Sequence, residues 1–199
     1  EGDVFTHTAL MLNRLRTTDV PLAWAVLLHD VGKPPTAKWV DGRHRFERHA
    51  DVGAAMARAI LGRLRFSNEA IDTIVFMIGN HMRFVKTHEM RRATLRRLVG
   101  APTFARELEL HRLDCEASHG DLENYRHLQG FLEQMRAEPV LPAPWVNGHD
   151  VMALGIPAGP EVGHWRKKAY DAQLEGIVRT REELLEWLRD RVERKEKGT

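Results

Sequence analysis

The chain has 199 residues, of which 43% are hydrophobic, so it can bury a core without help from disulfides. Its formal net charge of +2 does not indicate the lopsided basic surface that is typical of a nucleic-acid-binding protein. The single cysteine excludes an internal disulfide framework and favours a reducing compartment.

No apolar run in the sequence approaches the ~20 residues that a bilayer-spanning helix needs. The opening residues also lack the basic region and the apolar stretch of a signal peptide. We therefore expect a cytoplasmic protein without a membrane partner. Nothing in the sequence predicts its oligomeric state.

Helical patterns dominate the first half of the chain. A first helix is predicted over residues 3–16, and a second opens at Pro21, where Asp19 is a candidate N-cap. Gly32, followed by two prolines, ends that second helix. The stretch KWVDGRHRF then predicts a small hairpin or an ordered loop, because an Asp-Gly pair is typical of a tight turn.

Further helices follow with only short interruptions. They are predicted over 49–65, from Ser67 through residue 81, and over 88–99, 103–119, 122–137, 160–175 and 181–195. A segment rich in proline and glycine begins after residue 138 and marks a boundary. We therefore predict an all-α fold, with a helical bundle over residues 1–137 and a C-terminal helical extension over residues 138–199.

The dipeptide His29-Asp30 ends the second predicted helix. His29 shares a helical face with Leu22 and Val26, which predicts that its ring points into the core. Asp30 follows a segment that is apolar on every side, and a buried carboxylate must be paired or must bind a metal ion. From this dipeptide alone, an aspartate that reaches solvent at the helix end is an equal alternative.

Three further histidines favour the metal-binding alternative. His81 ends a helical stripe that contains Ile74 and Ile78. His49 and His7 lie near the starts of their helices, on faces with apolar neighbours. Each one alone is more typical of a histidine that is satisfied in the core. Together with the dipeptide, however, they predict that several helix ends meet at one metal site.

These residues also carry a family resemblance. The spacing of His7, of His29-Asp30 within HDVGK, and of Asp114 resembles the signature of the HD superfamily of metal-dependent phosphohydrolases. The segments GDVFTHTALML, LAWAVLLHDVGKPPT, RFERHADVGA, RFSNEAID and NHMRF resemble the HD region of bacterial CCA-adding tRNA nucleotidyltransferases. NGHDVMALGIPAGPEVG and LEGIVRTREELLEWL are similar to the C-terminal segment of the same enzymes, so the resemblance covers nearly the whole chain.

One part of that family's pattern is missing from the sequence. The nucleotidyltransferase head needs a Gly-Ser turn and an Asp-x-Asp pair, and neither occurs here. We therefore expect no nucleotide addition by that chemistry. The sequence corresponds to the HD body and tail, as a gene in its own right or as a piece of a longer protein.

The resemblance implies six metal ligands, all of them imidazole or carboxylate side chains: His7, His29, Asp30, His49, His81 and Asp114. In the dinuclear arrangement that it implies, Asp30 bridges two metal ions. His49 and His81 hold one of these ions, and the second ion is held by His7, His29 and Asp114. Nitrogen and oxygen ligands without a thiolate predict Mn, Fe, Co, Ni or Zn, with Mg as a further candidate.

The resemblance also gives roles to residues around the ligands. Lys33 is expected to bind a substrate phosphate oxygen and to act with Asp30 in catalysis. Arg83 is a second candidate for a phosphate clamp, for which a solvated surface arginine is a close alternative. His111 is a candidate contact to the substrate.

The implied activity is hydrolysis of small phosphate esters. HD domains of CCA-adding enzymes are associated with cleavage of 2′,3′-cyclic nucleotides, 2′-nucleotides and simple phosphate esters, so we expect a phosphodiesterase or phosphomonoesterase that uses a metal-bound hydroxide. The competing hypothesis is a non-catalytic body that binds RNA such as tRNA, which the tail and the cluster at residues 91–97 favour. A complete ligand set favours the enzyme, because a scaffold does not need six metal-binding side chains.

Overall fold

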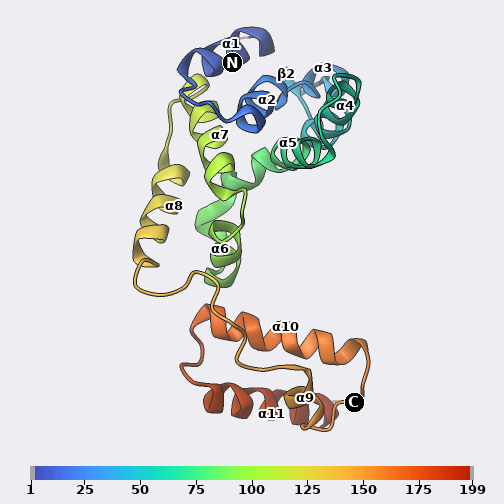
Figure 1. The fold of residues 1–199 in the computed structure, drawn as a ribbon, viewed down its shortest axis with the longest axis vertical. Coiled ribbons are helices and arrows are strands. Elements are labelled where there is room, and N and C mark those ends of the chain that lie inside the picture. The colour runs from blue at the N-terminus through green and yellow to red at the C-terminus, as the bar shows by residue number, and fades with distance from the viewer. Residues whose placement is uncertain (1–2, 198–199) are drawn as a thin grey trace. The chain divides into compact units, whose positions relative to one another are not determined.

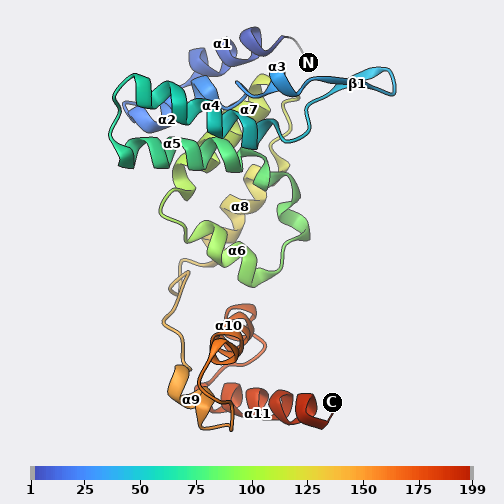
Figure 2. The same ribbon diagram turned by 90° about the vertical axis from the view of Figure 1, so that its right-hand side faces the viewer.

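The structure, a computed structural model, describes the backbone of residues 3–197 and the side chains up to residue 194. Helices make up nearly all of its regular structure, and the strands among the described residues form one short hairpin (Figure 1, Figure 2). The predicted all-α fold is confirmed. Within the described range, no helix is long and apolar enough to cross a membrane.

Packing divides the chain into two compact units. The first comprises the chain up to Glu89 together with Ala101–Glu133, and the second comprises Met90–Gly100 together with the chain from Gln134 onward. Residues 90–100 therefore pack with the C-terminal helices, although they precede the predicted boundary after residue 137. The division into folding domains at that residue stays a prediction.

The first unit begins with α1 (Val4–Arg14) and α2 (Val20–Leu28). Asp3 and Asp19 are their N-caps, and each carboxylate accepts backbone N–H groups of the first turn. The predicted cap at Asp19 is confirmed. Helix α1 ends earlier than predicted, because Leu15 already has an extended backbone with ψ of 125°.

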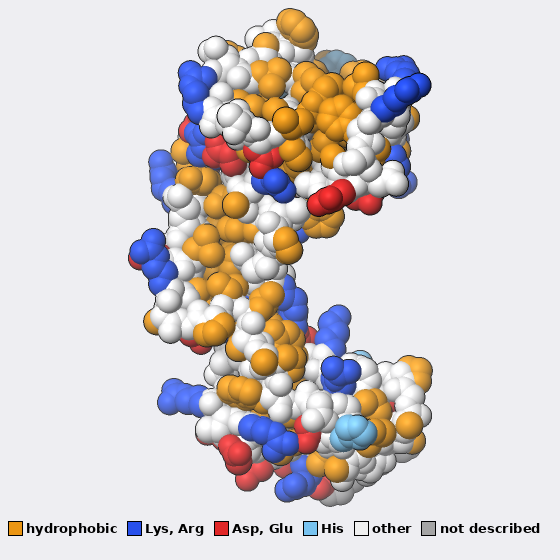
Figure 3. Space-filling model, viewed as in Figure 1, with side chains coloured by type: hydrophobic (Ala, Val, Ile, Leu, Met, Phe, Trp, Pro, Cys, Tyr) orange, Lys and Arg blue, Asp and Glu red, His pale blue; other side chains and the backbone are white. Residues whose placement is uncertain are grey.

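Helix α2 is apolar on every side, and the core covers only part of it. Leu22, Ala25 and Val26 are buried, whereas Val20 and Leu27 remain 54% and 42% exposed. Figure 3 shows hydrophobic side chains gathered over the region of α2 and α5. The buried face fixes the C-terminal end of α2, where the dipeptide His29-Asp30 lies, against the core.

A one-turn helix, α3 (Lys33–Thr36), follows α2 and leads into an antiparallel hairpin of β1 (Lys38–Val40) and β2 (Arg43–Arg45). Asp41 and Gly42 form its turn with φ of 50° and 74°, the left-handed conformation that tight hairpin turns require. The predicted turn is confirmed. The two prolines begin α3, where a missing N–H has no helical partner to lose.

Five more helical elements complete the first unit or lead out of it: α4 (His49–Arg63), α5 (Asn68–Asn80), the 3-10 helix η1 (His81–Glu89), α7 (Phe104–Ala117) and α8 (Glu123–Gln134). Ser67 caps α5, as predicted. The helix predicted over 88–99 is wrong in its first part, because residues 88–89 belong to η1 and Arg91 is extended, so α6 begins only at Arg92. Side chains of α1, α2, α4, α5 and α7 form one apolar core.

The second unit contains α6 (Arg92–Val99), α9 (Gly148–Met152), α10 (Pro160–Glu175) and α11 (Arg181–Lys197). Its core is mainly apolar, with Trp165 and Leu184 among the buried side chains. Two long polar side chains are also buried in this unit, Arg96 and Gln173. Helix α9 was not predicted; it is a single turn that a capping box at Asn147 stabilises.

Candidate metal centre

Three helix termini converge in the first unit and carry most of the predicted ligands. His29 follows the last residue of α2, His49 opens α4 and His81 follows the last residue of α5. Asp30 comes directly after His29, and these two side chains are 2% and 0% exposed. The predicted burial of the dipeptide is confirmed, and an Asp30 that reaches solvent is excluded.

The other two predicted ligands lie within helices α1 and α7. His7 lies in α1 and Asp114 lies in the last turn of α7. Their side chains meet at 3.1 Å between His7 Nε2 and Asp114 Oδ1. Together with His29 they form one group of three whose ligand atoms all lie within 4.8 Å of one another.

Asp30, His49 and His81 form a second group that meets the same limit. The carboxylate of Asp30 faces both groups. Its Oδ2 lies 3.2 Å from His29 Nε2, and its Oδ1 lies 3.7 Å and 3.9 Å from the Nε2 atoms of His49 and His81. One carboxylate with an oxygen toward each group is the arrangement that a bridging ligand requires.

Backbone hydrogen bonds orient three of the imidazoles. Nδ1 of His29, His49 and His81 each lies 2.7–2.9 Å from the carbonyl oxygen three residues earlier in the chain. A carbonyl accepts only, so Nδ1 carries the proton and Nε2 is left with its lone pair. In this tautomer, the Nε2 atoms of His49 and His81 face each other at 3.1 Å as two acceptors. Two facing lone pairs are stable only with a cation between or beside them.

Several polar atoms of the cluster also lack a hydrogen-bond partner. His7 Nε2, His29 Nε2 and Asp30 Oδ2 are buried, and their nearest charged neighbours, which include Asp114 Oδ1 at 3.1 Å from His7 and Lys33 Nζ at 2.7 Å from Asp30, do not lie in hydrogen-bond geometry. Buried polar atoms without a partner are rare and require a reason. Because the donor set is imidazole and carboxylate, it suits a divalent ion such as Mn, Fe, Co, Ni or Zn. The residues present fit the metal centre that the sequence predicts.

The protonation states of the cluster agree with metal binding. Burial lowers the pKa of His81 to about 4, so its ring is neutral at pH 7. Burial alone would raise the pKa of Asp30, but His29 and Lys33 hold it well below its ordinary value. The contact with Asp114 raises the pKa of His7. Metal ligands must be deprotonated, so His7 is the ligand that retains a proton most readily.

Two glycines allow the turn after Asp30 to approach α4. A Cβ atom on Gly32 would lie 2.1 Å from the carbonyl oxygen of His49 and 2.6 Å from the backbone nitrogen of Gly53. Only glycine therefore fits at position 32 in this packing. The close approach places Asp30 beside His49. The sequence showed Gly32 as a helix stop and did not indicate this second role.

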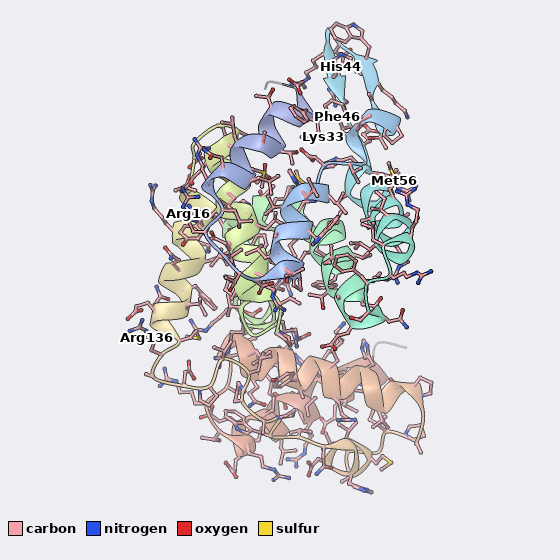
Figure 4. All side chains as sticks on the ribbon, turned by 45° about the horizontal axis from the view of Figure 1, so that its top comes forward. Arg16, Lys33, His44, Phe46, Met56 and Arg136 are labelled. Carbon is pink, nitrogen blue, oxygen red and sulfur yellow. The ribbon has the colours of Figure 1, made fainter. Side chains whose placement is uncertain are left out.

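Two cavities open onto the cluster, with volumes of about 580 and 510 Å³. Asp30, Lys33, His44, Phe46 and Ser118 line both of them. Figure 4 shows Lys33 and Phe46 close together at the base of the hairpin that carries His44. His44 lies in a polar segment and is exposed at the cavity lining, and no periodic pattern marked Phe46. Their position follows from β2, which leads back from the tip of the projecting hairpin toward the start of α4 (Figure 2).

Two of the three predicted substrate contacts lie at these cavities. Lys33 Nζ is 2.7 Å from Asp30 Oδ2 and its side chain is 19% exposed. His111 lines the second cavity beside Asp114, and burial lowers its pKa. Arg83 is not brought to either cavity lining. Its guanidinium lies 2.7 Å from the buried carboxylate of Glu107, and this ion pair explains its position.

Comparison with known proteins agrees with the motifs. The chain is 38% identical over 172 residues to a CC-adding tRNA nucleotidyltransferase of Thermus thermophilus, which covers 82% of the chain and 39% of that protein. It is 34% identical over 197 residues to an A-adding tRNA nucleotidyltransferase of Deinococcus radiodurans, which covers 91% of the chain and 45% of that protein. The chain thus spans less than half the length of these relatives.

A protein-family model, that of the HD domain, matches residues 3–117. This range is more than half of the chain, and it contains all six side chains of the cluster. The chain therefore belongs to the HD domain family.

Proposed function

We propose that the protein is a metal-dependent phosphohydrolase that cleaves phosphodiesters or phosphomonoesters, with 2′,3′-cyclic nucleotides and other small nucleotides as substrates. The position of Asp30 carries the proposal. Its two oxygens face two groups of imidazole and carboxylate ligands at the floor of open cavities. A purely structural metal site would be closed to solvent.

His7, His29 and Asp114 would hold one divalent ion, Asp30, His49 and His81 would hold another, and Asp30 would touch both. Bound ions of this kind supply a hydroxide nucleophile at neutral pH and stabilise the charge that develops on phosphate oxygens. The backbone carbonyls fix the three imidazoles with Nε2 toward the site, so the ligands need no reorganisation.

Lys33 supplies the positive charge for the substrate. Its ammonium lies at the lining of both cavities, where a phosphate oxygen can accept its hydrogen bond. His111 is uncharged at neutral pH, because burial lowers its pKa, and it offers a hydrogen bond without a charge. These two side chains would orient the ester against the metal centre.

Hydrolysis assays test the proposal. Protein stripped of metal is supplied with Mn, Co, Ni or Zn and assayed on 2′,3′-cyclic AMP and on bis(p-nitrophenyl) phosphate, with Asp30→Ala beside it. We expect metal-dependent turnover that the variant lacks. Equal turnover by the variant, or none by the native protein with every metal, would contradict the proposal.

A second candidate function, an RNA-binding body, has its own support. The relatives are named as tRNA nucleotidyltransferases. In the second unit, Arg97, Arg166, Lys167 and Tyr170 line a cavity of about 330 Å³, and the guanidinium of Arg97 lies 5.5 Å from the Tyr170 ring. Cations beside aromatic rings suit a nucleic-acid strand. Binding of tRNA that weakens steeply with salt, in the absence of any turnover, would favour this function.

A further inference from the structure

The cavity of about 510 Å³ has one aromatic wall. It is formed by His44 and Phe46 of the hairpin, whose rings are nearly parallel, with 17° between their planes and 6.1 Å between their centroids. Residues 44 and 46 are two apart on an extended segment, so their side chains leave the same face. The Phe46 ring lies 5.7 Å from Lys33 Nζ, which joins this wall to the predicted phosphate contact.

Further residues make part of the lining apolar. Met82 and Val85 on η1 line the same cavity, and they remain 47% and 52% exposed. Exposed apolar side chains inside a polar catalytic cavity are available to a ligand. The cavity of about 580 Å³ lacks Met82 and Val85; its exposed apolar side chain is Leu10, which is 42% exposed and lies beside the polar Asp3 and Thr6.

We propose that the smaller cavity binds the nucleobase of the substrate, against Phe46 and His44 and in contact with Met82 and Val85. The inference rests on the proposed phosphohydrolase function and adds where the base lies. A base in this cavity places its attached phosphate at Asp30 and Lys33, which line the same space. The hairpin thus selects nucleotides over phosphate esters without a ring.

The test compares substrates that differ only in the base. 2′,3′-Cyclic AMP is compared with ribose 2′,3′-cyclic phosphate, which has the same cyclic diester and no base. Phe46→Ala is expected to raise the KM for cyclic AMP roughly 5- to 100-fold, as loss of a base-stacking ring does, and to change that for the ribose ester less than 3-fold. Phe46→Trp retains a ring and is expected to behave like the native protein.

A matched control comes from α1. Phe5 is 81% exposed and lies outside the linings of both cavities, so Phe5→Ala removes the same ring without touching the proposed subsite. We expect no change in either KM. Equal losses on both substrates in Phe46→Ala would overturn the inference, because Phe46 would then act only through Lys33.

A binding measurement separates this inference from the proposed function. AMP and ribose 5-phosphate are titrated into the protein, and their Kd values are compared for the native chain and Phe46→Ala. We expect AMP to bind at least 5-fold more tightly, and the variant to lose that preference. A preference for AMP without any turnover would contradict the hydrolase and retain the base site. Turnover without a preference for AMP would support the hydrolase and contradict the base site.

Discussion

The two units differ in the partners that their buried polar side chains contact. In the second unit, the guanidinium of Arg96 donates to two backbone carbonyls, and the amide of Gln173 bonds to backbone groups on the segment beside it. In the first unit, the buried imidazoles donate Nδ1 to backbone carbonyls but turn Nε2 toward one another and toward Asp30. Burial is similar, but the second group of atoms faces other ligand atoms of the cluster in place of backbone groups.

This difference identifies which buried polar groups serve the fold and which serve a ligand. A buried group with backbone partners contributes to stability, and its loss leaves those partners unsatisfied. A buried group whose lone pair meets another lone pair costs stability until a cation binds. The same test assigns Glu107 of the first unit to the fold, because Arg83 and Thr103 contact its carboxylate.

The largest effect is expected at Asp30. Asp30→Ala removes the carboxylate that faces both ligand groups, so we expect loss of both ions and a fall in turnover beyond the roughly 10- to 100-fold typical of a residue that only supports a ligand. Metal content and kcat/KM measure it. Helical content should be unchanged, and a variant that retains two ions per chain would contradict the arrangement.

Gly32 tests whether the site depends on the close approach of backbones. In Gly32→Ala, the new methyl group meets the carbonyl of His49, so we expect about 1–3 kcal/mol of destabilisation and weaker metal binding. The matched control is Gly62→Ala in α4, the helix that Gly32 approaches, because the Cβ there would meet nothing within 4 Å. That variant should be up to about 1 kcal/mol more stable than the native protein with unchanged metal affinity.

The pKa of His81 predicts a pH dependence of the metal-free protein. The unfolded chain takes up this proton near its ordinary pKa of 6.5, whereas the folded chain takes it up only near pH 4. Below pH 6.5 the unfolded state therefore binds more protons, and stability falls as the pH falls toward 4, by about 1–3 kcal/mol. Urea unfolding of the native protein and of His81→Gln measures it. An equal slope in both would contradict the assignment.

The smallest functional effect is expected in the second unit. Gln173→Leu leaves the N–H of Trp145 and the carbonyl of Ala143 without their partner, so we expect about 1–3 kcal/mol of destabilisation. Metal content and hydrolysis at a temperature where the variant is folded should stay at native values. A loss of metal in this variant would remove the distinction between the two units.

Much of the fold could be predicted from local patterns. The caps at Asp19 and Ser67 and the turn at Asp41-Gly42 depend on a few neighbouring residues, and the structure confirms them. The helix predicted over 88–99 was wrong in its first part because the extended backbone at Arg91 has no local signal such as glycine or proline. The early end of α1 likewise has no sequence marker.

The site was predictable only as far as residue types and helical faces allow. The burial of His29 and Asp30 followed from the apolar segment before them. The pairing of His7 with Asp114 joins residues far apart in the chain, and only the family resemblance suggested it. The places of His44 and Phe46 depend on how the hairpin is set between α3 and α4, which no pattern along the chain encodes. Arg83 was a reasonable candidate by position, but its partner Glu107 lies on another helix.

The most direct test of the account is the anomalous scattering of crystals grown from metal-stripped protein with Mn²⁺ added. The account predicts two peaks in the first unit, one in contact with His7, His29 and Asp114 and the other in contact with Asp30, His49 and His81. Empty density within this cluster, with manganese bound elsewhere or nowhere, would contradict it.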